Sequence, residues 1–235
     1  MANLNARISF PAAMLADPVR ETMVMALMDG RAYSSKELAY RARITPQTAS
    51  FHLKKLVESQ ILICHRQGRG AYYRLNGAEV AAAIEALSRI APSPNVPSHV
   101  GRQAGPLRYA RRCYDHLAGR LGVEVAKRVE GLGLVVAHGL DYDLTAEGHC
   151  FFADMGMDIS GLRDRRRSFL RPCVDWTERK PHLAGSLGAA LLDHYVAEDW
   201  LRPGTQSRQL LLTDLGRRMF RERFGLSGES LEPIA

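Results

Sequence analysis

Two short segments, about sixty residues apart, hold most of the side chains in this chain that can bind a metal ion or act as a nucleophile. The first offers Cys113 and His116, and the second offers Cys173, Asp175 and His182. We expect both histidines at the start of a helix, and Cys113 and His116, three residues apart, on one face of the same helix. Two thiolates and two imidazoles make a tetrahedral ligand set for zinc or another soft metal. We therefore expect these five residues to form an effector site, with a metal or metalloid ion as the leading candidate ligand.

The same residues permit other interpretations of what this site does. Solvent-accessible thiols of low pKa sense oxidants and other thiol-reactive agents. A small organic effector could instead bind in the second half of the chain, or the cysteines could be small core residues without ligand chemistry. The four cysteines (Cys64, Cys113, Cys150 and Cys173) are widely spaced and form no C-x-x-C pair. We expect them to be reduced thiols, and no cofactor is certain from the sequence.

A second group of polar residues follows Thr45-Pro46, which combines a capping hydroxyl with a proline suited to the first helical position. Ala49, Leu53 and Leu56 would form the inner face of this helix, leaving small polar side chains outside. Gln47 can make paired hydrogen bonds to an adenine edge. The residues that we expect to contact DNA are Thr45, Gln47, Thr48, Ser50, His52, Lys54, Lys55, Arg66, Arg69 and Arg74.

Charge is concentrated in the same region. The chain has a net charge of +7, and the segment from Arg31 to Arg74 holds nine basic residues against two acidic ones. Basic side chains that neutralise phosphates release condensed counterions, which is the main source of nonspecific affinity for DNA. Double-stranded DNA is therefore the expected partner of this part of the chain.

The elements that would position these residues can be read from periodicity and capping signals. A long helix with apolar residues at four-residue spacing is expected over Phe10–Met28, and a short one follows Ser34 or Ser35. The remaining expected elements are the helix after Thr45, two strands at Ile61–His65 and Ala71–Leu75 joined by a turn at 67–70, and a last helix over Gly77–Ile90. This order indicates a winged helix-turn-helix.

Residues 10–91 resemble the ArsR/SmtB family of repressors. The resemblance is carried by Leu15-Ala16-Asp17-Pro18-Val19-Arg20, by Ser35 to Ala39 and by Ser50-Phe51-His52-Leu53-Lys54-Lys55-Leu56. It implies a homodimer formed through the first and last helices, bound to a DNA operator. The family's sensing sites do not carry over, because residues 34–57 contain no cysteine and residues 77–91 contain no histidine.

Beyond a proline-rich linker at 92–106, the chain repeats itself. The segment His116-Leu-Ala-Gly-Arg-Leu-Gly122 recurs as His182-Leu-Ala-Gly-Ser-Leu-Gly188, with six identities in seven positions. Each copy continues as a helix, a hairpin whose second strand ends in Leu-Thr, and a final helix. We expect repeats at about 116–157 and 182–225, packed about a pseudo-twofold axis, and a tail at 226–235.

The expected fold is mainly α with small β-hairpins, an α+β architecture. It consists of a winged helix-turn-helix domain at 1–91, the linker, and a duplicated winged-helix-like αββα domain at 107–225. The chain lacks a phosphate loop, a G-x-S-x-G motif and an H-E-x-x-H motif, so we do not expect an enzyme. A thiol enzyme using Cys113 with its neighbours Asp115 and His116 is a remote alternative.

The absence of eighteen consecutive apolar residues and of a signal pattern predicts a cytoplasmic protein that does not enter the membrane. The function that we expect is sequence-specific transcriptional regulation. In the leading interpretation, a homodimeric repressor is released from DNA when an effector acts on the second domain. The alternative is a constitutive or architectural DNA-binding regulator whose second domain only oligomerises.

Overall fold

The computed structural model describes residues 7–68, 70–91, 105–205 and 208–232. The chain divides into two compact units, Met1–Ile84 and Glu85–Ala235, which are described separately below. The division falls inside helix α5 (Ala78–Ile90), a few residues before the boundary expected at 91. Most of the expected linker lies outside the described residues, and its last two positions begin helix α7 (Gly105–Tyr109).

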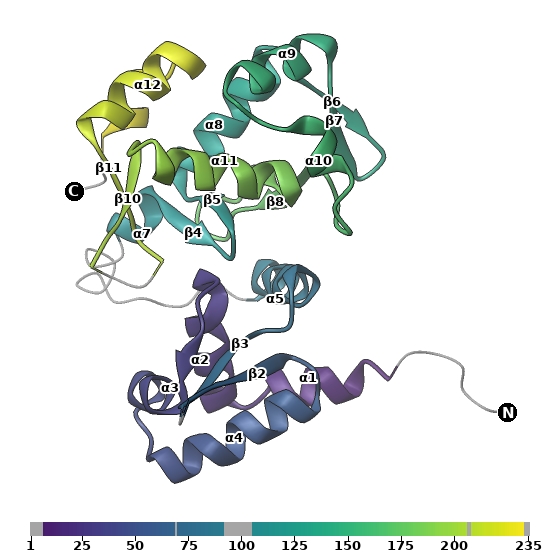
Figure 1. The fold of residues 1–235 in the computed structure, drawn as a ribbon, viewed down its shortest axis with the longest axis vertical. Helices are drawn as coiled ribbons and strands as arrows, with labels where there is room; N and C mark the ends of the chain where they lie inside the picture. The colour runs from purple at the N-terminus through teal and green to yellow at the C-terminus, as the bar shows by residue number, and fades with distance from the viewer. Residues whose placement is uncertain (1–6, 69, 92–104, 206–207, 233–235) are drawn as a thin grey trace, which may run out of the picture. The chain divides into compact units, whose positions relative to one another are not determined.

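The first unit is a winged helix-turn-helix (Figure 1). Its strands form one antiparallel sheet in the order β1-β3-β2. The elements that precede α5 are α1 (Ser9–Leu15), α2 (Pro18–Ala26), a 3-10 helix (Leu27–Asp29), β1 (Tyr33–Ser34), α3 (Ser35–Ala42), α4 (Pro46–Glu58), β2 (Leu62–Gln67) and β3 (Gly70–Leu75).

The single helix expected over Phe10–Met28 is wrong, because the chain breaks at Asp17. The Asp17 carboxylate accepts hydrogen bonds from the backbone N–H groups of Val19 and Arg20, both at 3.0 Å, so it caps a new helix with Pro18 in its first turn. The buried Arg20 guanidinium donates to the carbonyls of Met14 (2.6 Å) and Ala13 (2.9 Å). Arg20 thereby satisfies carbonyls at the end of α1 and fixes α1 against α2.

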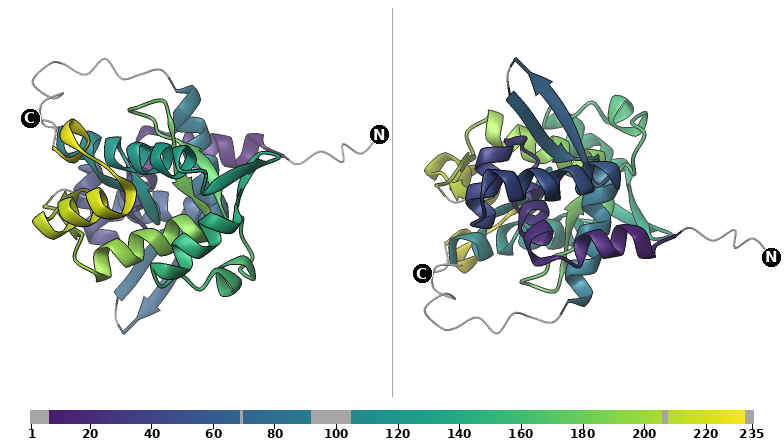
Figure 2. Two further views of the ribbon diagram at one scale, coloured as in Figure 1. Left: turned by 90° about the horizontal axis from the view of Figure 1, so that it is seen from above. Right: turned by 90° about the horizontal axis from the view of Figure 1, so that it is seen from below.

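Capping interactions set the start of both helices of the helix-turn-helix. Ser34 and Glu37 form a reciprocal capping box at the start of α3, and Arg43 ends that helix in the left-handed conformation. The Thr45 hydroxyl accepts from the backbone N–H of Thr48 at 3.2 Å and begins α4 as expected. The wing hairpin pairs from Leu62↔Leu75 to Gln67↔Gly70, longer than expected, and it extends clear of the helices of the first unit (Figure 2).

The second unit contains two successive runs with the same order of elements: hairpin, helix, hairpin, helix (Figure 1). The first run consists of β4 (Arg111–Cys113), β5 (His116–Ala118), α8 (Arg120–Gly131), β6 (Val135–His138), β7 (Asp141–Leu144) and α9 (Ala146–Asp154). The second consists of β8 (Arg171–Val174), β9 (Pro181–Ala184), α11 (Gly185–Ala197), β10 (Leu201–Pro203), β11 (Leu210–Leu212) and α12 (Asp214–Phe224). Helix α10 (Ile159–Arg163) lies between them, and a 3-10 helix (Gly228–Leu231) follows.

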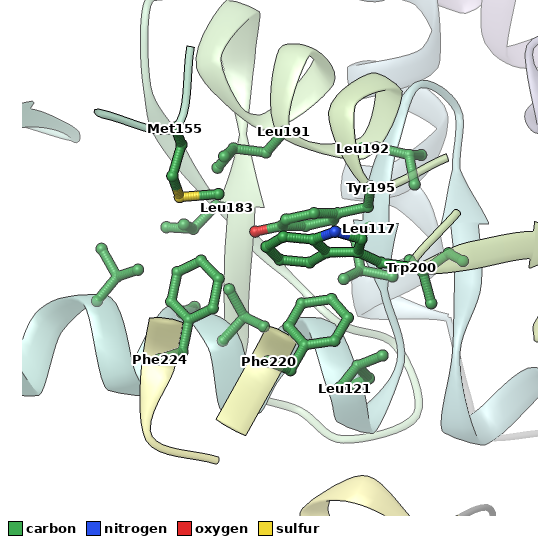
Figure 3. Packing of buried hydrophobic residues seen from close by; sticks show 14 of the residues in the cluster. Leu117, Leu121, Met155, Leu183, Leu191, Leu192, Tyr195, Trp200, Phe220 and Phe224 are labelled. Atoms are coloured by element: carbon green, nitrogen blue, oxygen red, sulfur yellow. The ribbon is translucent and has the colours of Figure 1, made fainter. Parts of the chain in front are cut away.

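The two runs pack through exchanged contacts, because α8 of the first contacts β9 of the second while α11 contacts β5. One apolar core joins them. At its centre Tyr195 stacks on Trp200, with ring centroids 5.1 Å apart, and Phe220 meets both rings edge-on (Figure 3). Each of these large rings buries more apolar area than an aliphatic side chain can.

Two expectations for the second unit need correction. His116 and His182 were expected at helix starts, but they lie on strands β5 and β9, and the helices begin after Gly119 and at Gly185. Both glycines have positive φ (82° and 91°), which ends the strand before each helix starts. The segment expected to be a tail also differs, because Leu226 and Leu231 are buried in the core.

Candidate functional site

Most of the polar side chains expected to face DNA are exposed on α4. Gln47, Thr48, Ser50 and Lys54 are exposed, and Lys55 is partly buried. The hydroxyl of Thr48 lies 2.9 Å from that of the exposed Thr45, and Ser50 donates to the Pro46 carbonyl at 2.9 Å. These local hydrogen bonds fix the hydroxyls at the start of the helix, where backbone N–H groups also point outward.

His52 does not belong to this surface, so the expectation that it contacts DNA is wrong. Only 9% of the residue is exposed, and its Nδ1 lies 3.7 Å from Asp17 Oδ1. Position 52 shares the inner face of the helix with Ala49, Leu53 and Leu56. His52 therefore packs the helix-turn-helix onto the start of α2.

Two exposed aromatic residues lie on the helix-turn-helix. Neither is among the residues that were expected to contact DNA. Phe51 on α4 is 56% exposed, and the Lys55 ammonium lies 4.3 Å from its ring centroid. Tyr40 on α3 is 86% exposed. The sequence signal for this surface was a large aromatic residue at a position outside the apolar repeat of each helix, because side chains at such positions are normally polar.

The wing places Arg66 on β2 and Arg74 on β3, and both are exposed. Arg69, expected at the hairpin tip, lies outside the described residues. Cys64 is exposed and pairs across the strands with Tyr73. The wing therefore provides two basic side chains beside a polar recognition helix, which suits contact with phosphates.

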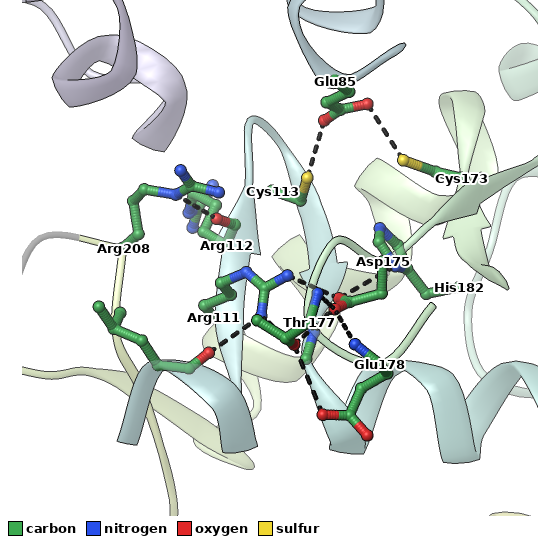
Figure 4. A network of polar contacts seen from close by, with 12 residues as sticks. Glu85, Arg111, Arg112, Cys113, Cys173, Asp175, Thr177, Glu178, His182 and Arg208 are labelled. Atoms are coloured by element: carbon green, nitrogen blue, oxygen red, sulfur yellow. Dashed lines mark hydrogen bonds and ion pairs between the residues drawn. The ribbon is translucent and has the colours of Figure 1, made fainter. Parts of the chain in front are cut away.

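The structure brings Cys113, His116, Cys173 and His182 together in the second unit. One potential ligand atom from each residue lies within 4.8 Å of the other three, and all four residues are buried, none more than 4% exposed. Asp175, expected as a fifth member, is not part of this group of four. Figure 4 shows Cys113, Cys173 and His182 with the surrounding polar contacts.

Each hairpin supplies one cysteine and one histidine at directly opposed positions. Cys113 pairs with His116 between β4 and β5, and Cys173 pairs with His182 between β8 and β9. Directly opposed residues of antiparallel strands have neighbouring side chains on one face. The expectation that Cys113 and His116 share a helix face is therefore wrong, although the hairpin produces the same proximity.

The two imidazoles face each other across the boundary between the two runs. His116 Nε2 and His182 Nε2 lie 3.1 Å apart, and each ring has a carboxylate on its other nitrogen. Asp115 Oδ1 is 3.1 Å from His116 Nδ1. Asp175 Oδ2 is 3.5 Å from His182 Nδ1, which makes no hydrogen bond in the described structure. A carboxylate on Nδ1 directs the Nε2 lone pair inward.

Two arginines neutralise these carboxylates. Asp175 and Arg111 form a fully buried ion pair of 2.7 Å, and Asp175 Oδ2 also accepts from the Gly119 N–H at 2.8 Å. Arg167 pairs with Asp115. The role of Asp175 is therefore to connect the two runs and to face His182, not to occupy a ligand position.

The titration behaviour of the cluster follows from its burial. Although burial opposes it, the hydrogen bond to Asp115 raises the pKa of His116 to about 9. Burial and the neighbouring His116 charge hold the pKa of His182 well below its usual value. The neighbouring Cys173 thiol, with burial and the Glu85 charge, raises the pKa of the Cys113 thiol. His116 therefore favours its protonated form and His182 its neutral form, beside a Cys113 thiol that favours its neutral form.

Glu85, the first residue of the second unit, accepts hydrogen bonds from both thiols (Figure 4). Its Oε1 lies 2.8 Å from Cys113 Sγ and its Oε2 lies 3.1 Å from Cys173 Sγ. Buried neutral thiols behave as inert small residues toward substrates. This geometry gives no support to the remote alternative of a thiol enzyme at Cys113.

An apolar pocket lies where the two runs meet, but it is small. Its lining includes Leu117 and Gly122 of the first run and Leu183 and Gly188 of the second, and its volume is about 10 Å³. That is room for about one water molecule, far less than an organic ligand requires.

In the described part of the chain, no helix is long and apolar enough to cross a membrane.

Comparisons with known proteins define the class. Residues 15–65 match a helix-turn-helix domain family. Over 224 residues, covering 95% of this chain and 99% of the relative, the sequence is 39% identical to the HTH-type transcriptional regulator YdfF of Bacillus subtilis (strain 168). The chain therefore belongs to the HTH-type transcriptional regulators.

Similar solved structures cover somewhat more than a third of the chain. HlyU from Vibrio cholerae is 26% identical, with a TM-score of 0.35, and the match covers 38% of this chain and 97% of that one. The transcriptional repressor BigR from Xylella fastidiosa is 31% identical, with a TM-score of 0.34, over 37% of this chain and 87% of that one.

Proposed function

We propose that this regulator is a homodimeric repressor of the ArsR/SmtB type that reads an operator through α4 and the wing. The observation that carries the proposal is the division of α4 into two faces. Ala49, Leu53 and Leu56 are completely buried, while Gln47 and Lys54 are exposed on the opposite side. A helix held in this way can enter a major groove without disturbing the core.

The side chains of this surface divide by role. Gln47 is suited to paired hydrogen bonds with an adenine edge, which would specify sequence. Lys54, Arg66 and Arg74 are suited to phosphates, which would position the protein on any duplex. Arg66 and Arg74 lie on paired strands of one hairpin, so they would act as a single basic clamp.

The partner that we propose for α1 and the end of α5 is a second copy of this chain. Helix α1 has no buried residue, and Phe10 on it is 53% exposed. On α5, Leu87 is 47% and Ile90 is 81% exposed. A dimer would cover this apolar surface and would place two recognition helices on two half-sites.

We infer that the second unit arose by duplication and that it is the effector domain. The order of elements, the exchanged packing of α8 and α11, and the repeated Cys–His pairing support a common origin for the two runs. The buried cluster at their junction supports an ion rather than an organic ligand. Release from DNA would then follow a change in this unit, by a shift of population between two conformations.

Selection of bound fragments from random duplex DNA by the full-length protein tests the DNA-binding proposal. We expect enrichment of a twofold-symmetric site whose half-sites are about one helical turn apart. Gln47→Ala should broaden the selected sequence at one position in each half-site. Lys127→Ala is the control, because Lys127 is an exposed cation on α8 of the second unit and is not part of the proposed surface. Failure of the parent protein to enrich any sequence would contradict the proposal.

A further inference from the structure

We propose that Cys113, His116, Cys173 and His182 bind one divalent ion of the zinc class in a closed tetrahedral site that joins the two halves of the second unit. The site concerns this unit alone, so it stands whether or not α4 binds DNA as proposed above. It names the chemistry of the effector: a borderline or soft metal ion that prefers thiolate and imidazole ligands.

The distances match such an ion. Tetrahedral zinc has bonds of about 2.3 Å to sulfur and 2.0–2.1 Å to nitrogen, which places neighbouring ligand atoms roughly 3.3–3.8 Å apart. In this chain the four ligand atoms lie within 4.8 Å of one another, and the two Nε2 atoms are 3.1 Å apart. A movement of about 1 Å or less in the side chains would complete the geometry, with the backbone of both hairpins unchanged.

The direction of the lone pairs gives an independent argument. The Asp115 carboxylate can only accept, so its contact with His116 Nδ1 places a proton on that nitrogen. Asp175 Oδ2 lies 3.5 Å from Nδ1 of His182, close to this ring nitrogen but without a hydrogen bond in the described structure. Two Nε2 lone pairs at 3.1 Å repel each other unless a cation lies between them. A metal ion bound also by both sulfurs would meet this need, taking the place of any proton shared by the two rings.

The charges balance when the ion is divalent. Binding a divalent ion forms two metal–sulfur and two metal–nitrogen bonds, and the two thiols and the shared imidazole site release their protons to solvent. Two thiolates then neutralise the ion, while Arg111 and Arg167 already neutralise Asp175 and Asp115. The Glu85 carboxylate, which loses its two thiol donors in this step, keeps Arg171 as its partner at 3.8 Å. Each charge in the cluster then has a partner of opposite sign, which avoids the large cost of an unpaired buried charge.

The ligands also have the outer partners that metal-binding histidines usually have. Each imidazole faces a carboxylate, and each of these carboxylates is held by an arginine. Such outer partners fix the orientation of ligand rings and are a recurrent feature of zinc sites. All four positions come from protein, so no open position remains for a substrate, as in a site that stabilises or switches a fold rather than one that catalyses.

Cobalt substitution of the full-length protein is the direct test. The protein is stripped with a chelator under reducing conditions and titrated with Co²⁺, whose thiolate charge-transfer and visible d–d bands report tetrahedral sulfur coordination. We expect saturation at about one ion per chain and competitive loss of the bands on adding Zn²⁺. Cys113→Ser and Cys173→Ser should each lose most of the charge-transfer band. Cys150→Ser, which removes an exposed cysteine of the same unit, should behave like the parent.

A second measurement protects the test against misfolded variants. The melting temperature of the parent protein should rise on adding Zn²⁺, since an ion that binds only the folded state stabilises it by mass action. The same addition should leave the melting temperature of a folded Cys113→Ser/Cys173→Ser protein unchanged. Two results would overturn the proposal: a parent protein that shows neither the cobalt bands nor the shift, or a parent whose Cys113 and Cys173 form a disulfide in the isolated state and bind no ion after reduction.

Discussion

His116 and His182 lie 66 residues apart in the chain, yet their Nε2 atoms face each other at 3.1 Å. The contact arises because the second strands of the two leading hairpins, β5 and β9, lie against each other. Each strand carries its histidine opposite a cysteine, so packing two similar hairpins together assembles all four side chains. The cluster is therefore a consequence of the way in which the two halves of the unit are joined.

The carboxylate behind His116 gives the first prediction. Asp115→Asn should weaken Co²⁺ or Zn²⁺ binding by about 10- to 100-fold, because the amide orients the imidazole less strongly and lowers its basicity. Competition with a chelator of known affinity measures the change. Asp143→Asn is the matched control, since Asp143 also pairs with an arginine of this unit, Arg163, but has no histidine ligand beside it. Equal affinities for the parent and for Asp115→Asn would contradict the assigned role.

The buried ion pair between Arg111 and Asp175 gives the second. Asp175→Ala should lower the free energy of unfolding of the second unit by about 3–5 kcal/mol, because it leaves the Arg111 guanidinium buried without its partner. Denaturation by urea, followed through the fluorescence of the buried Trp200, measures the free energy of unfolding. Asp154→Ala breaks the exposed pair with Arg223 and should cost at most about 1 kcal/mol. A similar small loss for both variants would show that the pair contributes little.

Gly119 gives a third prediction, which concerns the junction between strand and helix. Gly119 has φ of 82°, and an added Cβ would lie 2.8 Å from the carbonyl oxygens of Arg108 and Tyr109. We expect Gly119→Ala to destabilise the unit by more than about 1 kcal/mol through backbone strain and the clash. Gly131→Ala, at the end of the helix that follows Gly119 and with open space around it, should be neutral or stabilising by up to about 1 kcal/mol. Thermal melting of both variants measures the two effects. Equal melting temperatures for Gly119→Ala and Gly131→Ala would refute the role of strain and clash at Gly119.

Much of the first unit could be predicted from the sequence, since local signals decide it. The Thr45-Pro46 start and the apolar period of Ala49, Leu53 and Leu56 define α4, and the glycines around the hairpin define the wing. The break at Asp17 was missed because the apolar period continues across it, although Asp17-Pro18 is itself a helix-start signal. His52 was misplaced because a histidine suits either a polar or an inner face.

The second unit was harder to predict because its repeats differ in loop length. Cys113 and Cys173 are 60 residues apart, whereas His116 and His182 are 66 apart, since the second leading hairpin has a longer loop. A search at one fixed offset therefore finds the His-Leu-Ala-Gly segment but misses the preceding strand that carries each cysteine. The convergence of the four side chains was predicted from their types and from the expected pseudo-twofold packing of the two repeats, while the hairpins that achieve it were not predicted.

The DNA surface gives a fourth prediction, which separates sequence reading from phosphate contact. Gln47→Ala should cost about 1–3 kcal/mol on the selected operator and little on an unrelated duplex. Arg66→Ala should weaken binding to both duplexes about equally and reduce the dependence of affinity on salt concentration. Titrations of labelled duplexes at several salt concentrations measure both effects. Identical losses for the two variants on the two duplexes would contradict the division of roles.

The exposed apolar residues of α1 and α5 give a fifth prediction. Phe10→Glu and Leu87→Glu should each halve the mass measured by sedimentation, because a charge in a buried dimer interface is strongly unfavourable. Leu140→Glu is the control, since Leu140 is 94% exposed in the β6–β7 turn and should have no effect on assembly. A parent protein that sediments as a monomer at micromolar concentration would contradict the dimer directly.

We propose that an ion bound by the cluster of the second unit controls the affinity of the first unit for DNA. The most direct measurement is the anisotropy of a labelled operator titrated with metal-free protein, with and without Zn²⁺. We predict that Zn²⁺ lowers the affinity of the parent by at least about fivefold, the lower end of typical allosteric couplings, and leaves the Cys113→Ser/Cys173→Ser protein unchanged. Equal operator affinity of the parent with and without bound Zn²⁺ would contradict the coupling, even if the ion binds.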